Sequence, residues 1–156
     1  MIKIRAGFFA LPVLGLLAMA PKADAAQKLI PAANCDNFNA NEANDIDRLV
    51  FGVRTLVNAT RYVVCSLPRE LTVAGGTVVV NGQVFPGSTM YVTVYAENNL
   101  GSQTFAAKSV SPSPTANFQT SISFTQQELP STALLTVLVG LPANGGGYYT
   151  STSMDH

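Results

Sequence analysis

Hydrophobic and polar residues alternate with a period of two along most of the chain beyond residue 45. This pattern is typical of β-strands with one buried face and one wet face. The clearest case is the segment 88–98 (STMYVTVYAEN), whose two faces carry Met90, Val92, Val94 and Ala96 against Tyr91, Thr93, Tyr95 and Glu97. The same reasoning predicts strands in 48–58, 60–67, 77–85, 102–110, 118–126, 133–141 and 147–153.

Three segments carry more detailed expectations. The dipeptide Asn81-Gly82 is typical of a two-residue hairpin turn, because both positions of that turn need positive φ. The segment 133–141 (ALLTVLVGL) is apolar on both faces, which predicts a central strand covered on both sides. A sustained helical period is absent from the sequence, and the segment 40–49 (ANEANDIDRL) has room for one helical turn at most.

Many short strands in a chain of this size predict an all-β fold, a two-layer antiparallel β-sandwich of about eight or nine strands, Ig-like or jelly-roll-like. The segment 109–117 (SVSPSPTAN) is then a crossing between strands, because too few residues follow it to build a second core. A small outer-membrane β-barrel also alternates, but the chain lacks Trp and its outward residues are Thr, Ser and Gln.

The first 25 residues have the features of a cleavable signal peptide: a basic start, an apolar run from Ala6 to Ala20, and Ala23-Asp24-Ala25 before the expected cut at Ala26. Residues 26–156 then form a single β-sandwich domain, secreted or periplasmic, without a transmembrane segment or a lipid-anchoring cysteine. The segment 1–25 holds three of the nine basic and one of the nine acidic residues. The remaining net charge of −2 argues against a nucleic-acid partner.

The sequence contains two cysteines, Cys35 and Cys65. An exported chain meets an oxidising compartment, so we expect a structural disulfide between them. A reactive thiol or a thiolate metal site lacks support, since the sequence has no C-x-x-C motif and no histidine partner.

The stretch VNATRYVVCSLPRE resembles small, uncharacterised secreted bacterial proteins with a pattern near N-x-(S/T)-x-R-x-V-x-C-P-x-x-R. The matching positions are Asn58, Thr60, Arg61, Val63 or Val64, Cys65, Pro68 and Arg69. Proline here is displaced from the position directly after the cysteine. The resemblance implies a β-sandwich and implies no activity.

The segment NCDNFNANEANDID is crowded with oxygen-bearing side chains. Asn37, Asn39 and Asn41 have the ligand spacing of an EF-hand, but Glu42 stands where the loop needs glycine and Arg48 where it needs glutamate. A looser calcium site is a weaker alternative, built from Asp36, Asn39, Asp45 and Asp47. Turn chemistry explains these residues better, so we predict neither a metal nor another cofactor.

Catalytic motifs are missing from the sequence. The one histidine, His156, ends the chain, and no nucleophile or zinc motif occurs. Glu70 and Glu97 are the candidates for glycoside hydrolysis, but we expect a turn position for the first and a wet strand end for the second. We therefore predict a non-enzymatic protein.

Two functions remain. The first is a structural or interaction role at the cell envelope or outside the cell, with another envelope protein as partner. The alternative is a carbohydrate-binding module that uses tyrosine rings as stacking platforms for a glycan. Its candidate residues are Tyr91 and Tyr95, which share a strand face, and Tyr148 and Tyr149, which follow a glycine-rich loop.

Overall fold

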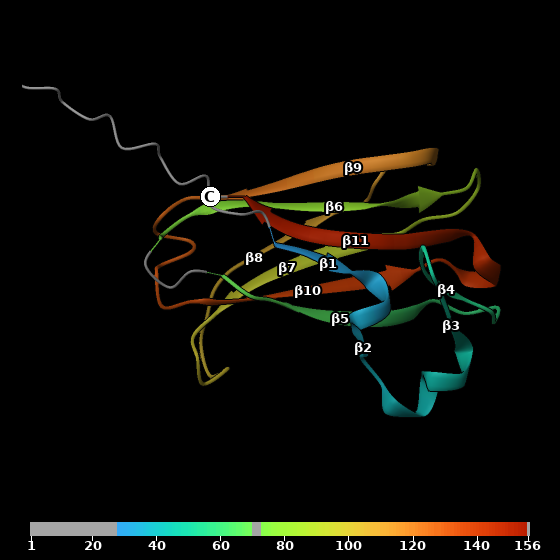
Figure 1. The fold of residues 1–156 in the computed structure, drawn as a ribbon, viewed down its shortest axis with the longest axis horizontal. Helices are drawn as coiled ribbons and strands as arrows, with labels where there is room; N and C mark the ends of the chain where they lie inside the picture. The colour runs from blue at the N-terminus through green and yellow to red at the C-terminus, as the bar shows by residue number, and fades with distance from the viewer. Residues whose placement is uncertain (1–27, 70–72, 156) are drawn as a thin grey trace, which may run out of the picture.

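The computed structural model describes residues 28–69 and 73–155; the predicted signal peptide, Glu70 and His156 lie outside these ranges. The described residues form eleven strands in two antiparallel sheets that stack face to face (Figure 1). The strands are β1 (Lys28–Pro31), β2 (Asp36–Asn37), β3 (Ile46–Leu49), β4 (Gly52–Thr55), β5 (Arg61–Leu67), β6 (Gly76–Val84), β7 (Tyr91–Glu97), β8 (Thr104–Val110), β9 (Thr115–Phe124), β10 (Leu134–Leu141) and β11 (Gly147–Asp155). Three short 3₁₀ helices join them: η1 (Ala32–Asn34), η2 (Ala40–Asp45) and η3 (Ala143–Gly145).

The strand order identifies the kind of sandwich. The six-stranded sheet has the order β3-β4-β11-β6-β9, with β1 also paired to β11, and the five-stranded sheet has the order β2-β5-β10-β7-β8. The eight strands from β4 to β11 therefore pair first with last and second with seventh, which is the jelly-roll arrangement of two Greek keys. The predicted β-sandwich is confirmed, with more strands than the eight or nine expected.

The core lies between the two sheets and consists of the inward-facing residues of both. On β7 the predicted inward set is fully buried: Met90 just before the strand, then Val92, Val94 and Ala96. The largest fully buried side chain belongs to Tyr149 of β11. Burying this apolar surface is the main favourable term in folding, at about 25 cal/mol for each Å².

The Asn81-Gly82 turn was a wrong prediction, because both residues lie inside the continuous strand β6. Gly82 pairs with Phe118 of β9 and Tyr149 of β11, and both pairings shift register beside it. A Cβ on Gly82 would lie 2.4 Å from the Tyr148 carbonyl oxygen and 2.8 Å from the Phe118 ring. The glycine thus marks a close approach of strands and not a turn.

The segment 48–58 was also predicted wrongly, as one strand. It contains the end of β3, a two-residue turn at Val50 and Phe51, and β4. Val50 and Phe51 at this turn are exposed. The hydrophobic pattern missed the turn because turns are usually marked by Gly, Pro, Asn or Asp.

The crossing predicted in 109–117 is present: β8 ends at Val110 in one sheet, and β9 begins at Thr115 in the other. The predicted helical turn is present as η2. Cys35 and Cys65 form the expected disulfide. It joins the segment that passes from β1 in one sheet to β2 in the other to an inward position of β5.

The segment 133–141 is central, as predicted, but within residues 28–69 and 73–155 no second layer covers its outer face. β10 lies between β5 and β7, and its inward residues are buried. On the outer face, Thr136 and Leu138 are half-buried and Leu134 is 45% exposed. This uncovered apolar strand is the first sign of a functional surface.

Candidate functional site

The outer face of the five-stranded sheet carries four aromatic rings, and we call it the aromatic face: Phe38, Tyr62, Tyr91 and Tyr95. Residues directly opposite one another on neighbouring strands point to the same face. Tyr62 of β5 and Tyr91 of β7 both pair with Gly140 of β10, which brings them to one row of the sheet. The Phe38 amide donates to the Tyr62 carbonyl oxygen at 2.9 Å, and their rings meet edge to face with centroids 6.3 Å apart.

Gly140 leaves room for two of these rings. A Cβ at this position would lie 2.9 Å from Cε1 of Tyr62 and 3.4 Å from Cβ of Tyr91. Tyr62 therefore leans over the glycine, because no side chain stands between β5 and β7 in this row.

A groove of about 300 Å³ crosses the aromatic face. Phe38 and Tyr95 line it together with an aliphatic floor that includes Val64 and Leu138, while Thr136 and Glu97 add polar atoms. Phe38 is 58% exposed, so its ring is available to a ligand. An apolar groove with a few polar groups has the general character of a small-molecule site.

The electrostatic character of the groove is simple. Glu97 is the one charged residue that lines it. Further polar atoms stand between the rings: the Thr93 and Ser109 hydroxyl groups, on β7 and β8, are hydrogen-bonded to each other at 2.8 Å. A lone carboxylate repels anionic ligands, whereas hydroxyl groups both donate and accept hydrogen bonds.

Of the four tyrosines predicted from the sequence, the structure brings Tyr91 and Tyr95 together on the aromatic face. They are four residues apart on β7, which corresponds to roughly 13 Å along a strand. Tyr91 is 50% exposed and Tyr95 is half-buried. A ligand that touches both rings must therefore be an extended molecule.

Tyr148 lies on the six-stranded sheet and belongs to a different cluster. Its ring meets Phe51 at 5.4 Å and Phe85 at 5.7 Å, both edge to face. The Arg54 guanidinium lies over the ring at 5.5 Å, and Arg54 Nη1 donates to the Tyr148 hydroxyl oxygen at 3.0 Å. These neighbours occupy the ring of Tyr148, so it is no open platform.

Tyr149 points into the core and does not present its ring to a ligand, so the structure corrects its inclusion among the platforms. The side chain is fully buried, and its hydroxyl group lies 3.2 Å from Sγ of Cys65. Burial raises the pKa of the Tyr149 phenol well above its ordinary value. The physical reason is strand alternation: neighbours on a strand face opposite sides, so Tyr148 and Tyr149 never share a face.

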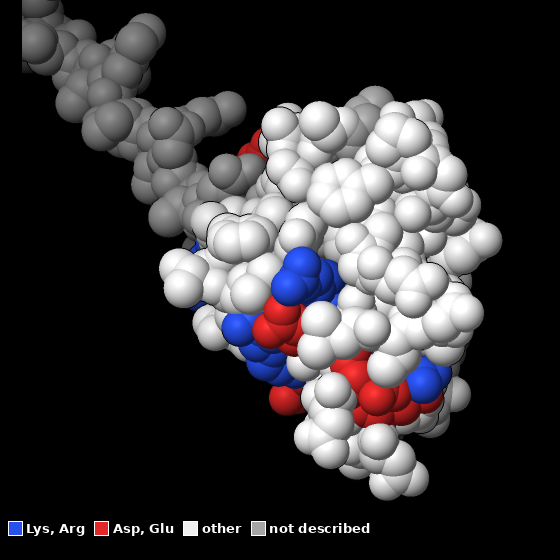
Figure 2. All heavy atoms as spheres, turned by 90° about the vertical axis from the view of Figure 1, so that its right-hand side faces the viewer, with Lys and Arg blue, Asp and Glu red and all other residues white. Residues whose placement is uncertain are grey.

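Two of the four residues of the calcium alternative form hydrogen bonds with arginines. Asp45 Oδ2 accepts a hydrogen bond from Arg61 Nε at 2.8 Å, and Asp47 Oδ2 accepts one from Arg54 Nε at 3.1 Å. The hydrogen bond that Arg54 donates to Asp47 is the main cause that raises the pKa of Arg54. In the described part of the chain, no three His, Cys, Asp or Glu side chains are grouped to hold a metal ion. Figure 2 looks onto the right-hand side of the view in Figure 1, and acidic and basic atoms lie against one another there.

The structure places one of the two candidate catalytic carboxylates. Glu97 lines the groove, whereas Glu70 and His156 lie outside the described residues. Glycoside hydrolysis uses a pair of carboxylates on either side of the bond. The groove lining supplies one.

Sequence reasoning missed Phe38 and Tyr62. Tyr62 follows the alternation of β5, where Val63 and Cys65 point inward, so this strand carried a usable signal. Phe38 lies in the Asn- and Asp-rich segment just after β2, where the sequence shows no alternation. Its position depends on a two-residue strand that pairs with β5.

No protein-family model matches this sequence, and the curated proteins give no match. Among solved structures, the fold is similar to the Arthrobacter globiformis T6 isomalto-dextranase complexed with panose, with 16% sequence identity, a TM-score of 0.50 and 83% of this chain covered. The chain spans 23% of the length of that enzyme. At this identity the similarity is one of fold.

Two carbohydrate-binding modules are also similar in fold. One is the module CBM36 in complex with calcium and xylotriose, with 16% identity, a TM-score of 0.48, and coverage of 82% of this chain and 99% of that one. The other is TmCBM61 in complex with β-1,4-galactotriose, with 14% identity, a TM-score of 0.42, and coverage of 84% and 85%.

Within residues 28–69 and 73–155, no helix has the length and apolarity needed to cross a membrane.

Proposed function

We propose that the protein is an exported, non-enzymatic binding module that holds a glycan across the aromatic face of its five-stranded sheet. The observation that carries the proposal is the uncovered groove between Phe38 and Tyr95, with its aliphatic floor. A contiguous patch of exposed rings and aliphatic side chains on a sheet face marks an interaction or ligand-binding surface. The disulfide fits an exported protein.

The chemistry of this face suits a saccharide. A sugar ring has an apolar C–H face and a polar rim, so it packs on a flat aromatic ring while its hydroxyl groups meet polar side chains. Tyr91 and Tyr95 supply rings along one strand, and Phe38 supplies one across the sheet. Thr93 and Thr136 lie between them with hydroxyl groups.

The test is retention of the chain beginning at Ala26 on insoluble polysaccharides, together with a glycan array. We expect binding to at least one glycan, and we expect Phe38→Ala and Tyr95→Ala to weaken it at least tenfold, since aromatic anchors dominate such interfaces. The matched control is Phe51→Ala. Phe51 is 61% exposed, close to the 58% of Phe38, but it lies on the β3–β4 turn.

Two results would contradict the proposal. The first is uniform failure to bind across the array. The second is equal loss of binding in Phe38→Ala and Phe51→Ala, which would mean that exposed rings bind the glycan non-specifically. If no glycan binds while the chain crosslinks to an envelope protein through the aromatic face, an interaction role replaces glycan binding.

A further inference from the structure

A second, more polar pocket lies at the end of the five-stranded sheet where β5 and β7 begin and β10 ends; we call it the end pocket. Its volume is about 400 Å³. Tyr91 lines it, so this ring belongs both to the aromatic face and to the end pocket. Three hydroxyl-bearing residues and one amide supply polar groups to the lining: Thr60, Ser88, Thr89 and Asn144.

The lining of the end pocket contains no charged side chain. Figure 2 looks onto this end of the molecule, and most of the charged atoms in the view lie from its middle downward. A carboxylate or sulfate group entering the pocket would lose water without meeting a cation, which is costly. Hydroxyl and amide groups instead complement a neutral ligand that is rich in hydroxyl groups.

The backbone of the end pocket is shaped for close approach. Asn144 has φ of 55°, in the left-handed region that Asn tolerates better than most residues. Its side-chain amide donates to Oδ1 of Asn58 at 3.0 Å. Two residues further along the chain, a Cβ on Gly146 would lie 2.1 Å from Oγ of Ser88, so the glycine lets Ser88 lie against the backbone.

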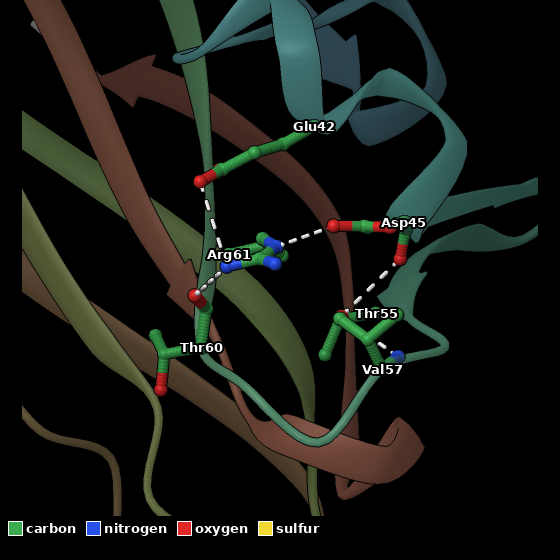
Figure 3. A network of polar contacts seen from close by, with 6 residues as sticks. All are labelled: Glu42, Asp45, Thr55, Val57, Thr60 and Arg61. Carbon is green, nitrogen blue, oxygen red and sulfur yellow. Dashed lines mark hydrogen bonds and ion pairs between the residues drawn. The ribbon is translucent and has the colours of Figure 1, made fainter.

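An ion-pair network holds the Thr60 side of the end pocket (Figure 3). Arg61 donates from Nε to Oδ2 of Asp45 at 2.8 Å and pairs with Oε1 of Glu42 at 3.5 Å. Arg61 Nη1 also reaches the Thr60 carbonyl oxygen at 3.5 Å. In Figure 3 the Thr60 hydroxyl group points away from this network, and Thr60 lines the end pocket.

Further hydrogen bonds join the segment 55–57 to η2 and to η3. The Asp45 carbonyl oxygen accepts from Thr55 Oγ1 at 3.2 Å and from the Leu56 amide at 2.8 Å. The Val57 carbonyl oxygen accepts from the Asn144 amide at 2.8 Å. These bonds hold the Thr60 side and the Asn144 side of the end pocket in place before a ligand arrives, which lowers the entropy cost of binding.

We propose that the end pocket is a second subsite for the same glycan and that it selects a neutral sugar residue through hydrogen bonds. This inference rests on the proposed function. The groove and Tyr91 supply apolar contact along the aromatic face, and the end pocket supplies selectivity for uncharged sugars. The protein should then prefer neutral oligosaccharides to their uronate counterparts.

The experiment is a titration of the ¹⁵N-labelled chain from Ala26, followed by amide chemical shifts. The probes are panose, xylotriose and β-1,4-galactotriose, with trigalacturonate as the anionic comparison and the glycan array supplying any further neutral ligand. We expect shifts at Thr60, Thr89 and Asn144 together with shifts at Tyr91. Thr89→Ala and Asn144→Gly should each weaken binding roughly three- to tenfold, as loss of single hydrogen bonds does.

Asn144→Gly keeps a backbone that accepts positive φ, so the variant tests the side chain. The matched control is Ser121→Ala, which removes an exposed hydroxyl group from the outer face of the other sheet and should leave affinity unchanged. Thermal unfolding of each variant identifies any general loss of structure.

The outcomes separate the two proposals. If no saccharide on the array binds, the proposed function fails and this inference fails with it. If a neutral saccharide binds, but shifts stay within the groove and both pocket variants bind like the parent chain, the end pocket is no subsite while the proposed function stands. If trigalacturonate binds as well as the neutral saccharides or better, selection for neutral sugars is wrong.

Discussion

Removing the Cys35–Cys65 disulfide should destabilise the protein strongly, and the structure gives the size of the effect. The two residues are 30 positions apart in sequence. In the chain-entropy relation, a loop of about 31 residues corresponds to about 3.7 kcal/mol at 25 °C. For a domain of about 130 residues, with an unfolding entropy near 2.1 cal/mol/K per residue, this lowers the melting temperature by roughly 13 °C.

The assay compares three samples by thermal and urea unfolding: the oxidised chain, the reduced chain and the Cys35→Ala/Cys65→Ala variant. Reduction removes the cross-link and leaves the buried sulfurs in place, whereas the double variant also removes their volume. Both Cys residues are at most 3% exposed, so the variant should be the least stable of the three. The urea m-value should rise on reduction, because an unbridged unfolded chain exposes more surface.

Reduction of the disulfide should also destabilise the structure locally, around Phe38. Phe38 follows Cys35 by three residues. It is held to β5 by the two-residue strand β2 and by one hydrogen bond from its backbone amide to the Tyr62 carbonyl oxygen. Amide exchange at Phe38 should therefore accelerate on reduction more than exchange in the middle of β10. A melting temperature that moves by less than about 3 °C on reduction would refute the entropic reasoning.

Three further changes have expected outcomes. Gly82→Ala should cost about 1–3 kcal/mol in urea unfolding, because its Cβ would lie 2.4 Å from the Tyr148 carbonyl oxygen; an unchanged midpoint would contradict this. Tyr149→Ala should cost about 3–5 kcal/mol by the same measurement, since it empties a fully buried aromatic site, and a loss below about 1 kcal/mol would argue against that packing. The ion pair with Lys108 and the Thr125 amide hold the pKa of Glu128 down to about 2, from an ordinary 4.5. The stabilisation is therefore present above pH 4.5 and lost as the pH falls toward 2. The free energies of unfolding of Glu128→Gln and of the parent chain should converge over that interval. A difference that stays constant with pH would count against the ion pair.

The sequence by itself determined the local features of this protein. Alternation along 88–98 predicted which side chains of β7 point inward, because successive residues of a strand point to opposite faces whatever the strand pairs with. The disulfide was predicted from the presence of two cysteines and from the predicted signal peptide. The same alternation, applied to Tyr148 and Tyr149, would also have excluded a shared platform, since adjacent strand residues face opposite sides.

Tertiary structure alone decided which faces are covered and which distant residues meet. The apolar outer face of β10 indicated a covered strand, but the described residues form no third layer over the sheet, and a local pattern cannot show this. Asn81-Gly82 has the composition of a turn. The glycine is required instead by the close approach of the Tyr148 carbonyl oxygen, 66 residues further along the chain. Phe38 and Tyr95 line one groove because β2 and β7 belong to the same sheet. Such contacts are set by long-range strand pairing, whereas periodicity reports only the few residues around each position.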